Sequence, residues 1–277
     1  MKKLVLASFI GAFALYSCGS DSNNAQDNIP QNIDSTSVEN DETTTEESMS
    51  YLLPSPLQIA ELFKNSGLTY IGDLTSPTKN AENYNTKYAQ KLNFGVYSAD
   101  MAYCIINNQT QSAIDYLSTL RRLSEKMWMT DVFNTMGLSK RLESNVNNHD
   151  SLVTIMADLQ IQLDNYLDEN GMGYTGPIIF AGAWVETMYL GAQVNQTNSN
   201  EKLVYRLTEQ AVVLENLLKA LEQINEDQEF DELIADLTVI NKNFDFLKED
   251  EDAVLNKEQI DNLSQQIIDL RTKIIKN

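Results

Sequence analysis

Residues 150–167, DSLVTIMADLQIQLDNYL, carry the clearest structural pattern in the chain. Their apolar side chains recur at intervals of three and four residues, which lines one face of an α-helix. Asp150 is a suitable N-cap for such a helix. The stretch therefore predicts an amphipathic helix that buries one face against other elements. The apolar positions are Leu152, Ile155, Met156, Leu159, Leu163, Tyr166 and Leu167.

The same periodicity extends over the rest of residues 51–277, and no stretch alternates convincingly with a period of two residues. Ser55-Pro56-Leu57-Gln58 predicts a capping box with proline at the first helical position, and Gly67 predicts the end of that helix. Residues 68–80 have the composition of a loop. We expect an all-α domain, a helical bundle of about seven helices. The expected helical ranges are 55–65, 82–107, 111–128 capped by Thr110, a broken stretch at 130–147, 150–167, 177–194 beginning at Pro177, 199–221 capped by Ser199, 230–247 and 260–274.

The chain is strongly acidic: its 277 residues include 40 acidic and 20 basic side chains, for a formal net charge of −20. This balance argues against nucleic acid as a partner, because phosphate binding relies on Lys and Arg. One histidine and two cysteines exclude metal sites built from several His or Cys ligands.

The N-terminus has the organisation of a secretory signal peptide over residues 1–17. Met1-Lys2-Lys3 is basic, and Leu4–Ser17 follows with 14 uncharged residues, too few to span a bilayer as a helix, which takes about 20. Leu15-Tyr16-Ser17-Cys18 resembles the lipobox of bacterial lipoproteins. The resemblance implies cleavage before Cys18 and diacylglycerol on its thiol, so that acyl chains anchor the protein in a lipid bilayer. An ordinary secretory signal with an incidental cysteine is the alternative.

The residues after Cys18 predict a location and a spacer. Residue 19 is glycine rather than the aspartate that retains enterobacterial lipoproteins at the inner membrane, so we expect the outer membrane, with the periplasmic face favoured over the cell surface. Residues 19–50 contain eight acidic residues and no basic or aromatic residue, and such a segment cannot bury enough apolar surface to fold. Residues 18–50 are therefore predicted to be a lipidated cysteine and a disordered tether, with a reach of about 30 Å. The domain at 51–277 keeps a net charge of −14.

A shift of 87 residues aligns two parts of the domain. Gly95 aligns with Gly182, Tyr97 with Trp184 and Met101 with Met188, and the run Asn-Gln-Thr at 108–110 aligns with the same run at 195–197. Either the bundle contains a duplicated three-helix unit, or the identities arise by chance.

Four local features resemble functional motifs, and each has a structural interpretation that we favour. Gly171–Gly176 matches G-x-G-x-x-G, but a helix precedes it instead of a strand, so we interpret the glycines as a turn. His149 has no second ligand nearby and is interpreted as a solvated loop residue. Cys104 lies in an apolar run and is interpreted as a buried small side chain. Glu249–Asp252 lacks the spacing of a calcium loop and is interpreted as a solvated connection between helices. We predict no catalytic residue, no cofactor and no metal site.

Two acidic residues stand alone within apolar stretches. Asp100 is the only charged residue between Phe94 and Ile106, and Glu186 is the only one in residues 177–194. A helix that is apolar on all sides belongs in the middle of a bundle. A carboxylate on such a helix has to be paired, hydrogen-bonded or protonated.

Two interpretations of these acids stay open. In the first, core partners such as Arg121, Arg122 or tyrosine hydroxyls satisfy them, and they only set the register of the helices. In the second, they line a pocket between two helices that takes a cationic or polyhydroxyl ligand. The candidate pocket residues are Tyr97, Asp100, Tyr103, Trp184, Glu186 and Tyr189.

Three short segments, at residues 93–103, 148–151 and 182–186, resemble a group of helical lipoproteins in Bacteroidota whose activity is unassigned. The resemblance implies a membrane-anchored envelope protein with a helical fold, and it implies no mechanism. We expect a non-enzymatic helical module that binds or scaffolds, with the lipid bilayer and another envelope protein as partners. A periplasmic ligand-binding receptor and an enzyme with an unrecognised site are the alternatives.

Overall fold

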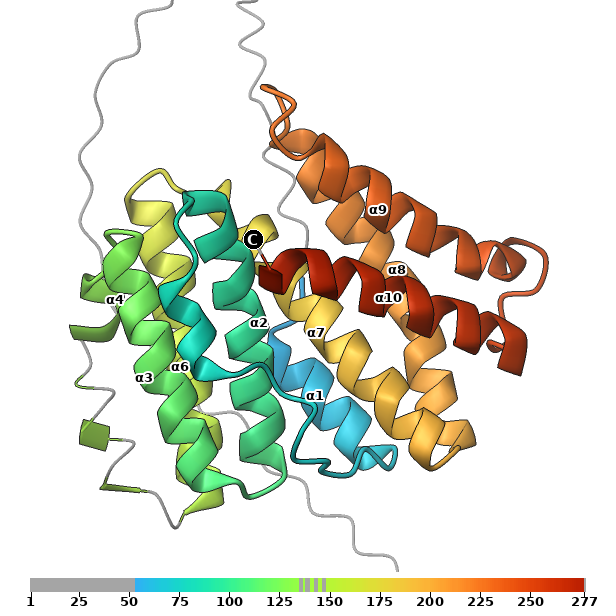
Figure 1. The fold of residues 1–277 in the computed structure, drawn as a ribbon, viewed down its shortest axis with the longest axis horizontal. Helices are drawn as coiled ribbons and strands as arrows, with labels where there is room; N and C mark the ends of the chain where they lie inside the picture. Colours follow the sequence, from blue (N-terminus) through green and yellow to red (C-terminus); the bar gives the residue numbers. More distant parts are fainter. Residues whose placement is uncertain (1–52, 135–136, 138–139, 142–143, 146–147, 277) are drawn as a thin grey trace, which may run out of the picture. The chain divides into compact units, whose positions relative to one another are not determined.

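Every secondary-structure element in the part of the chain that the computed structural model describes is helical (Figure 1). The structure describes residues 53–276 apart from 135–136, 138–139, 142–143 and 146–147, so the predicted signal peptide, Cys18 and tether lie outside the described residues. The predicted all-α fold is confirmed. Eight α-helices in the described part have ten or more residues, against the predicted total of about seven. The elements are α1 (Pro56–Asn65), η1 (Thr78–Glu82), α2 (Lys87–Ile106), α3 (Thr110–Lys126), α4 (Asp131–Asn134), α6 (His149–Glu169), α7 (Thr175–Thr197), α8 (Glu201–Gln223), α9 (Asp231–Asn241), η2 (Lys242–Lys248) and α10 (Lys257–Lys276), where η marks a 3₁₀-helix.

The first helix begins and ends as its sequence predicts. The Ser55 hydroxyl accepts the Gln58 N–H at 3.2 Å, and the Gln58 carboxamide accepts the Ser55 N–H at 2.7 Å, which is the reciprocal capping box. Gly67 follows the helix with φ of 103°, a left-handed conformation that suits glycine. The predicted loop at 68–80 is confirmed up to residue 77, and η1 begins at Thr78.

Two predicted N-caps are wrong because an asparagine one or two residues away performs the role. Asn148 caps α6 through a 3.1 Å hydrogen bond from the Ser151 N–H, and Asp150 lies inside the first turn. Asn200 caps α8 in place of Ser199. An asparagine carboxamide is as good a cap as Asp or Ser, so adjacent candidates leave the boundary uncertain by a residue or two.

Helix α7 lies at the centre of the bundle, with α1, α2, α8 and α10 packed against it (Figure 1). It begins at Thr175, two residues before the predicted Pro177, and is buried along most of its length. Asp100 on α2 and Glu186 on α7 are both 0% exposed, which confirms the predicted central position of both acids. None of the helices in the described part is both long and apolar enough to cross a membrane.

Helices α2 and α7 make the most extensive contact between any two described helices, and they cross at a pair of glycines. A Cβ atom placed on Gly95 would lie 1.8 Å from the Ile179 carbonyl oxygen. A Cβ atom placed on Gly182 would lie 1.9 Å from the Leu92 carbonyl oxygen. The two backbones therefore approach as closely as they do because both residues lack a side chain.

This crossing is reciprocal in the 87-residue alignment, since Leu92 and Ile179 are themselves 87 residues apart. Gly95 packs on Ile179 and Gly182 packs on Leu92, so the two contacts are equivalent in the alignment. The match stops at the ends of α2 and α7. Asn108 has φ of 58° in the turn after α2, and Thr110 is the first residue of α3, whereas residues 195–197 form the last turn of α7. Thr110 also makes no cap, because Gln109 occupies that position.

Candidate functional site

Three of the six candidate pocket residues form hydrogen bonds to the backbone of one loop. We call residues 68–77, between α1 and η1, the strap. The Tyr103 hydroxyl donates to the Thr69 carbonyl and accepts the N–H of residue 71, both at 2.7 Å. The Asp100 Oδ2 atom accepts the Ser76 N–H at 2.9 Å, and the Tyr97 hydroxyl donates to the carbonyl of residue 77 at 3.0 Å. These side chains recur every three residues along α2, so they line one side of the helix.

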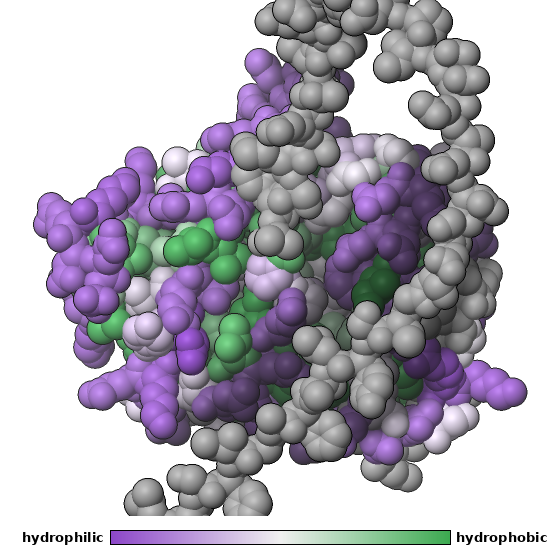
Figure 2. All heavy atoms as spheres, turned by 180° about the vertical axis from the view of Figure 1, so that it is seen from behind, coloured by the Kyte–Doolittle hydropathy of each residue, from purple (hydrophilic) through white to green (hydrophobic). Residues whose placement is uncertain are grey.

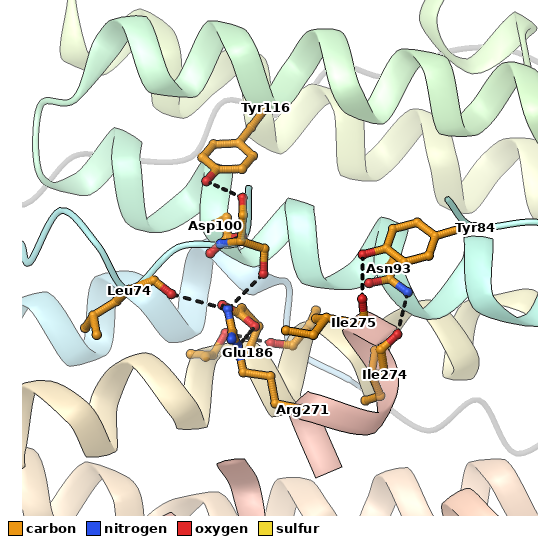
Figure 3. Close-up of polar contacts among 12 residues, drawn as sticks. Leu74, Tyr84, Asn93, Asp100, Tyr116, Glu186, Arg271, Ile274 and Ile275 are labelled. Carbon is orange, nitrogen blue, oxygen red and sulfur yellow. Dashed lines mark hydrogen bonds and ion pairs between the residues drawn. The ribbon is translucent and has the colours of Figure 1, made fainter. Parts of the chain in front are cut away.

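Two more helices bind the strap from other directions (Figure 3). Tyr116 of α3 donates to the Ser76 carbonyl at 2.9 Å. Arg271 of α10 donates to the Ser76 hydroxyl at 2.8 Å and to the Leu74 carbonyl at 3.2 Å. The strap has no regular secondary structure to satisfy its backbone, and buried backbone groups need partners. Side chains from α2, α3 and α10 supply those partners.

Glu186 and Arg271 form a buried ion pair beneath the strap. The guanidinium donates from Nε and Nη2 to the two Glu186 oxygens, at 2.5 and 2.8 Å, the bidentate geometry that carboxylates favour. Burial opposes the charge on Arg271, but the Glu186 carboxylate outweighs it and raises the pKa of the guanidinium. The ring of Tyr189 lies 4.0 Å from the guanidinium carbon and adds a cation–π contact.

The surroundings of Asp100 oppose the ionisation of its carboxyl group. Burial raises the pKa of its carboxyl well above the ordinary value of 3.8, and the neighbouring Glu186 raises it further. The Ser76 N–H and Arg271 act in the opposite direction. The second oxygen, Oδ1, accepts no hydrogen bond from any described residue.

The tyrosines around Asp100 keep their protons. Burial raises the pKa of Tyr103 to about 12 and also raises the pKa values of Tyr97 and Tyr116. Their hydroxyls are therefore hydrogen-bond donors to the strap at all moderate pH values.

The predicted site residues share one buried region of the core, but their partners differ from those expected. Arg271 is the partner of Glu186, and the prediction of Arg121 or Arg122 is wrong, because both side chains are 48% exposed on the outer side of α3. Trp184 is 0% exposed, and its indole N–H has no partner among the described residues. Asp100 and Glu186 are both 0% exposed, so neither is open to a ligand in this conformation.

Sequence reasoning missed Arg271 and Ser76. Arg271 follows Ile267 by four residues, so it lies on the apolar face of the last helix. A basic residue on an apolar face indicates a charge at the edge of the core. Ser76 lies in a loop with no periodicity, and no local pattern identifies it.

Two hollows on the surface are lined by described residues that do not include the buried acids. One has a volume of about 480 Å³ between the end of α1 and the start of α8, lined by Asn65, Ser66, Glu201, Lys202, Tyr205 and Arg206. The second has about 290 Å³ at the start of α6. The Arg206 charge in the first hollow is already paired with Glu209 at 2.6 Å.

The other motifs have structural roles where the structure describes them. Gly171 has φ of 63° and ends α6, which confirms the turn interpretation of the glycine motif. Cys104 is buried, and burial raises the pKa of its thiol to about 12. His149 is the first residue of α6, so its interpretation as a loop residue is wrong. Residues 249–252 are exposed after η2, and the described residues contain no group of three or more His, Cys, Asp or Glu that could hold a metal ion.

One surface feature stands apart from these structural roles. Trp128 follows α3 with φ of 62°, and its side chain is 81% exposed. The Lys87 ammonium lies 4.2 Å from the centre of its ring. One turn further along α2, the Lys91 ammonium lies 4.4 Å from the ring of Tyr174, which is 46% exposed. Because residues four apart are neighbours on a helix, the two rings flank one side of α2, and we call these four residues the aromatic platform.

On the face of the molecule opposite to that of Figure 1, apolar residues form separate patches between hydrophilic ones (Figure 2).

Neither a protein-family model, nor a curated protein, nor a solved structure matches this chain. The resemblance to helical lipoproteins of Bacteroidota therefore stays a prediction.

Proposed function

We propose that the protein is an envelope lipoprotein, held in the outer membrane by acyl chains on Cys18 and facing the periplasm. Its helical domain acts as a non-enzymatic module that binds another envelope protein, and the aromatic platform is the binding surface. The lipobox at residues 15–18 and the acidic spacer after it support the anchor. The exposed Trp128 ring is the single observation that supports the binding surface.

The backbone at Trp128 favours a different residue. Its N–H donates to the Glu125 carbonyl, and the next N–H donates to the Ser124 carbonyl at 2.8 Å, which is the Schellman end of α3. The corresponding positions after α1, α2 and α6 are Gly67, Asn108 and Gly171. Only α3, among these four helices, ends on a bulky side chain.

The fold gains little from this tryptophan. A left-handed backbone costs about 1–2 kcal/mol in a residue with a Cβ atom, and the exposed cation–π contact with Lys87 returns about 0.5–1 kcal/mol. The ring is mostly in water, so it buries little apolar area. Tryptophan is among the residues that most often dominate protein–protein interfaces.

The shape of the platform favours a macromolecular partner. Small ligands bind in concave sites that enclose most of their surface, whereas the Trp128 ring projects from the end of a helix. A projecting indole fits a pocket on a partner protein, as interface anchors do.

Site-specific photo-crosslinking in cells tests this proposal. A photoreactive residue is placed at Tyr174 in the full-length chain, and a single partner band is expected. The band should disappear when Trp128→Gly is added. Tyr205 is the matched control position, since it is 49% exposed with Arg206 over its ring, but it lies on α8. A band that persists with Trp128→Gly, or that forms equally from Tyr205, would show that the platform is not the binding surface.

A further inference from the structure

If Asp100 and Glu186 were both ionised, the buried cluster would lack one cation and one hydrogen-bond donor. Both oxygens of Glu186 are bound by Arg271, and Asp100 Oδ2 is bound by the Ser76 N–H. Asp100 Oδ1 has no donor among the described residues. Two carboxylates would therefore share one guanidinium, with one oxygen unsatisfied in a fully buried position.

A proton on Asp100 removes both problems. Glu186 is the charged neighbour with the largest effect on Asp100 and takes part in a side-chain interaction with it, so a proton on Asp100 has an acceptor nearby. The cluster then holds one negative and one positive charge. The titratable groups that interact with Asp100 are Tyr97, Tyr103 and Cys104 on α2, Tyr116 on α3, Glu186 and Tyr189 on α7, Arg271 on α10, and Tyr70 and Tyr84 from outside these helices.

We propose that Asp100 is protonated at neutral pH, that its Oδ1 hydroxyl donates to the Glu186 carboxylate, and that loss of this proton at higher pH loosens the strap. When the pH rises enough to remove the proton to solvent, a second negative charge appears beside Glu186 with no second cation to balance it. The repulsion acts directly beneath Ser76, so the strap at 68–77 is the element that loosens first.

The direction of the pH dependence follows from linkage. The folded pKa of Asp100 lies above the unfolded value, so its contribution to stability is fully present below the unfolded value and is lost as the pH rises through the folded value. Within that window folding takes up one proton. The folding equilibrium constant therefore falls about tenfold per pH unit from this group alone.

Asp100→Asn tests the proposal because it copies the neutral acid: its carbonyl accepts the Ser76 N–H, and its amide donates to Glu186. At neutral pH the infrared spectrum of the parent should contain the C=O band of a protonated carboxylic acid. Asp100→Asn should lack this band and should also lose the one-proton dependence of urea-unfolding stability on pH. Asp115→Asn, an exposed acid on α3, should keep both.

A second variant tests the same point without relying on the folding of the first. Glu186→Gln removes the neighbouring charge, so Asp100 should ionise to pair with Arg271, and the carboxylic acid band should disappear at neutral pH. A parent spectrum without the band, or a band that survives in Asp100→Asn, would overturn the proposal. An unchanged pH dependence in Asp100→Asn would overturn it equally.

Discussion

Replacing Gly182 by alanine should destabilise the protein more than any other glycine-to-alanine change in α7. The new Cβ would lie 1.9 Å from the Leu92 carbonyl oxygen, and real contacts of this kind stay beyond 3.0 Å. The backbones of α2 and α7 must therefore separate by about 1 Å at their crossing, which loosens side chains along both helices. Overpacking a core costs about 1–3 kcal/mol, and occasionally more. Because the Cβ atom is fixed to the backbone of α7 and the carbonyl belongs to the backbone of α2, neither group can rotate away, and we expect about 3 kcal/mol or more.

Gly176→Ala is the matched control in the same helix. Apart from its chain neighbours and the backbone of its own helix, nothing lies within 4 Å of a Cβ atom at that position, so alanine should change stability by no more than about 1 kcal/mol. Urea unfolding followed by circular dichroism measures both variants. In a thermal melt, 3 kcal/mol corresponds to about 6–12 °C for a domain of this size. If Gly182→Ala unfolds within 1 kcal/mol of the parent, the close crossing is not a feature of the folded protein.

Four further predictions follow from the structure and the sequence. Arg271→Met should lower stability by about 3–5 kcal/mol, because it leaves a buried carboxylate unpaired, and adding Glu186→Met should recover much of that loss in a urea titration. Cys18→Ser should abolish incorporation of an acyl-chain analogue during metabolic labelling, and equal labelling of parent and variant would refute the lipobox assignment. Deleting residues 22–48 should leave the thermal melt within a few degrees of the parent, and a larger drop would mean that the segment packs on the domain. Cys104 should react with a thiol reagent only when the protein unfolds, because its thiol is buried with a pKa of about 12, and rapid labelling of the native protein would contradict this.

The local parts of the fold were predictable from the sequence. The amphipathic helix at 150–167 and the capping box at Ser55 depend on residues within one or two turns of each other, so their patterns are legible in a single chain. The central position of α7 was equally legible, because a helix with one charge in 18 residues has no face for water. One predicted helix, at 230–247, is instead α9 followed by the 3₁₀-helix η2, since both types bury apolar residues at similar spacing.

The two buried acids of the candidate site were predictable from the sequence, but their partners were not. Asp100 and Glu186 stand out as isolated acids in apolar surroundings, but their roles depend on groups far away in the chain. Arg271 lies 85 residues after Glu186, and the strap precedes Asp100 by one element. The exposure of Trp128 was also hidden, because an aromatic residue between two methionines reads as core unless the left-handed turn is known. Contacts between residues far apart in the chain, and a positive φ at a residue such as Trp128, leave no local pattern in the sequence.

Hydrogen exchange at the Ser76 amide tests most directly whether Asp100, Glu186 and Arg271 form a closed structural cluster beneath the strap. The Ser76 N–H donates to Asp100 Oδ2 at 2.9 Å, and the residue is 1% exposed. At neutral pH we expect it to exchange as slowly as the amide of Met101 in the core of α2, through openings close to global unfolding. Exchange as fast as that of the exposed residues 249–252 would mean that the strap opens readily and that the acids face solvent, which would contradict the account.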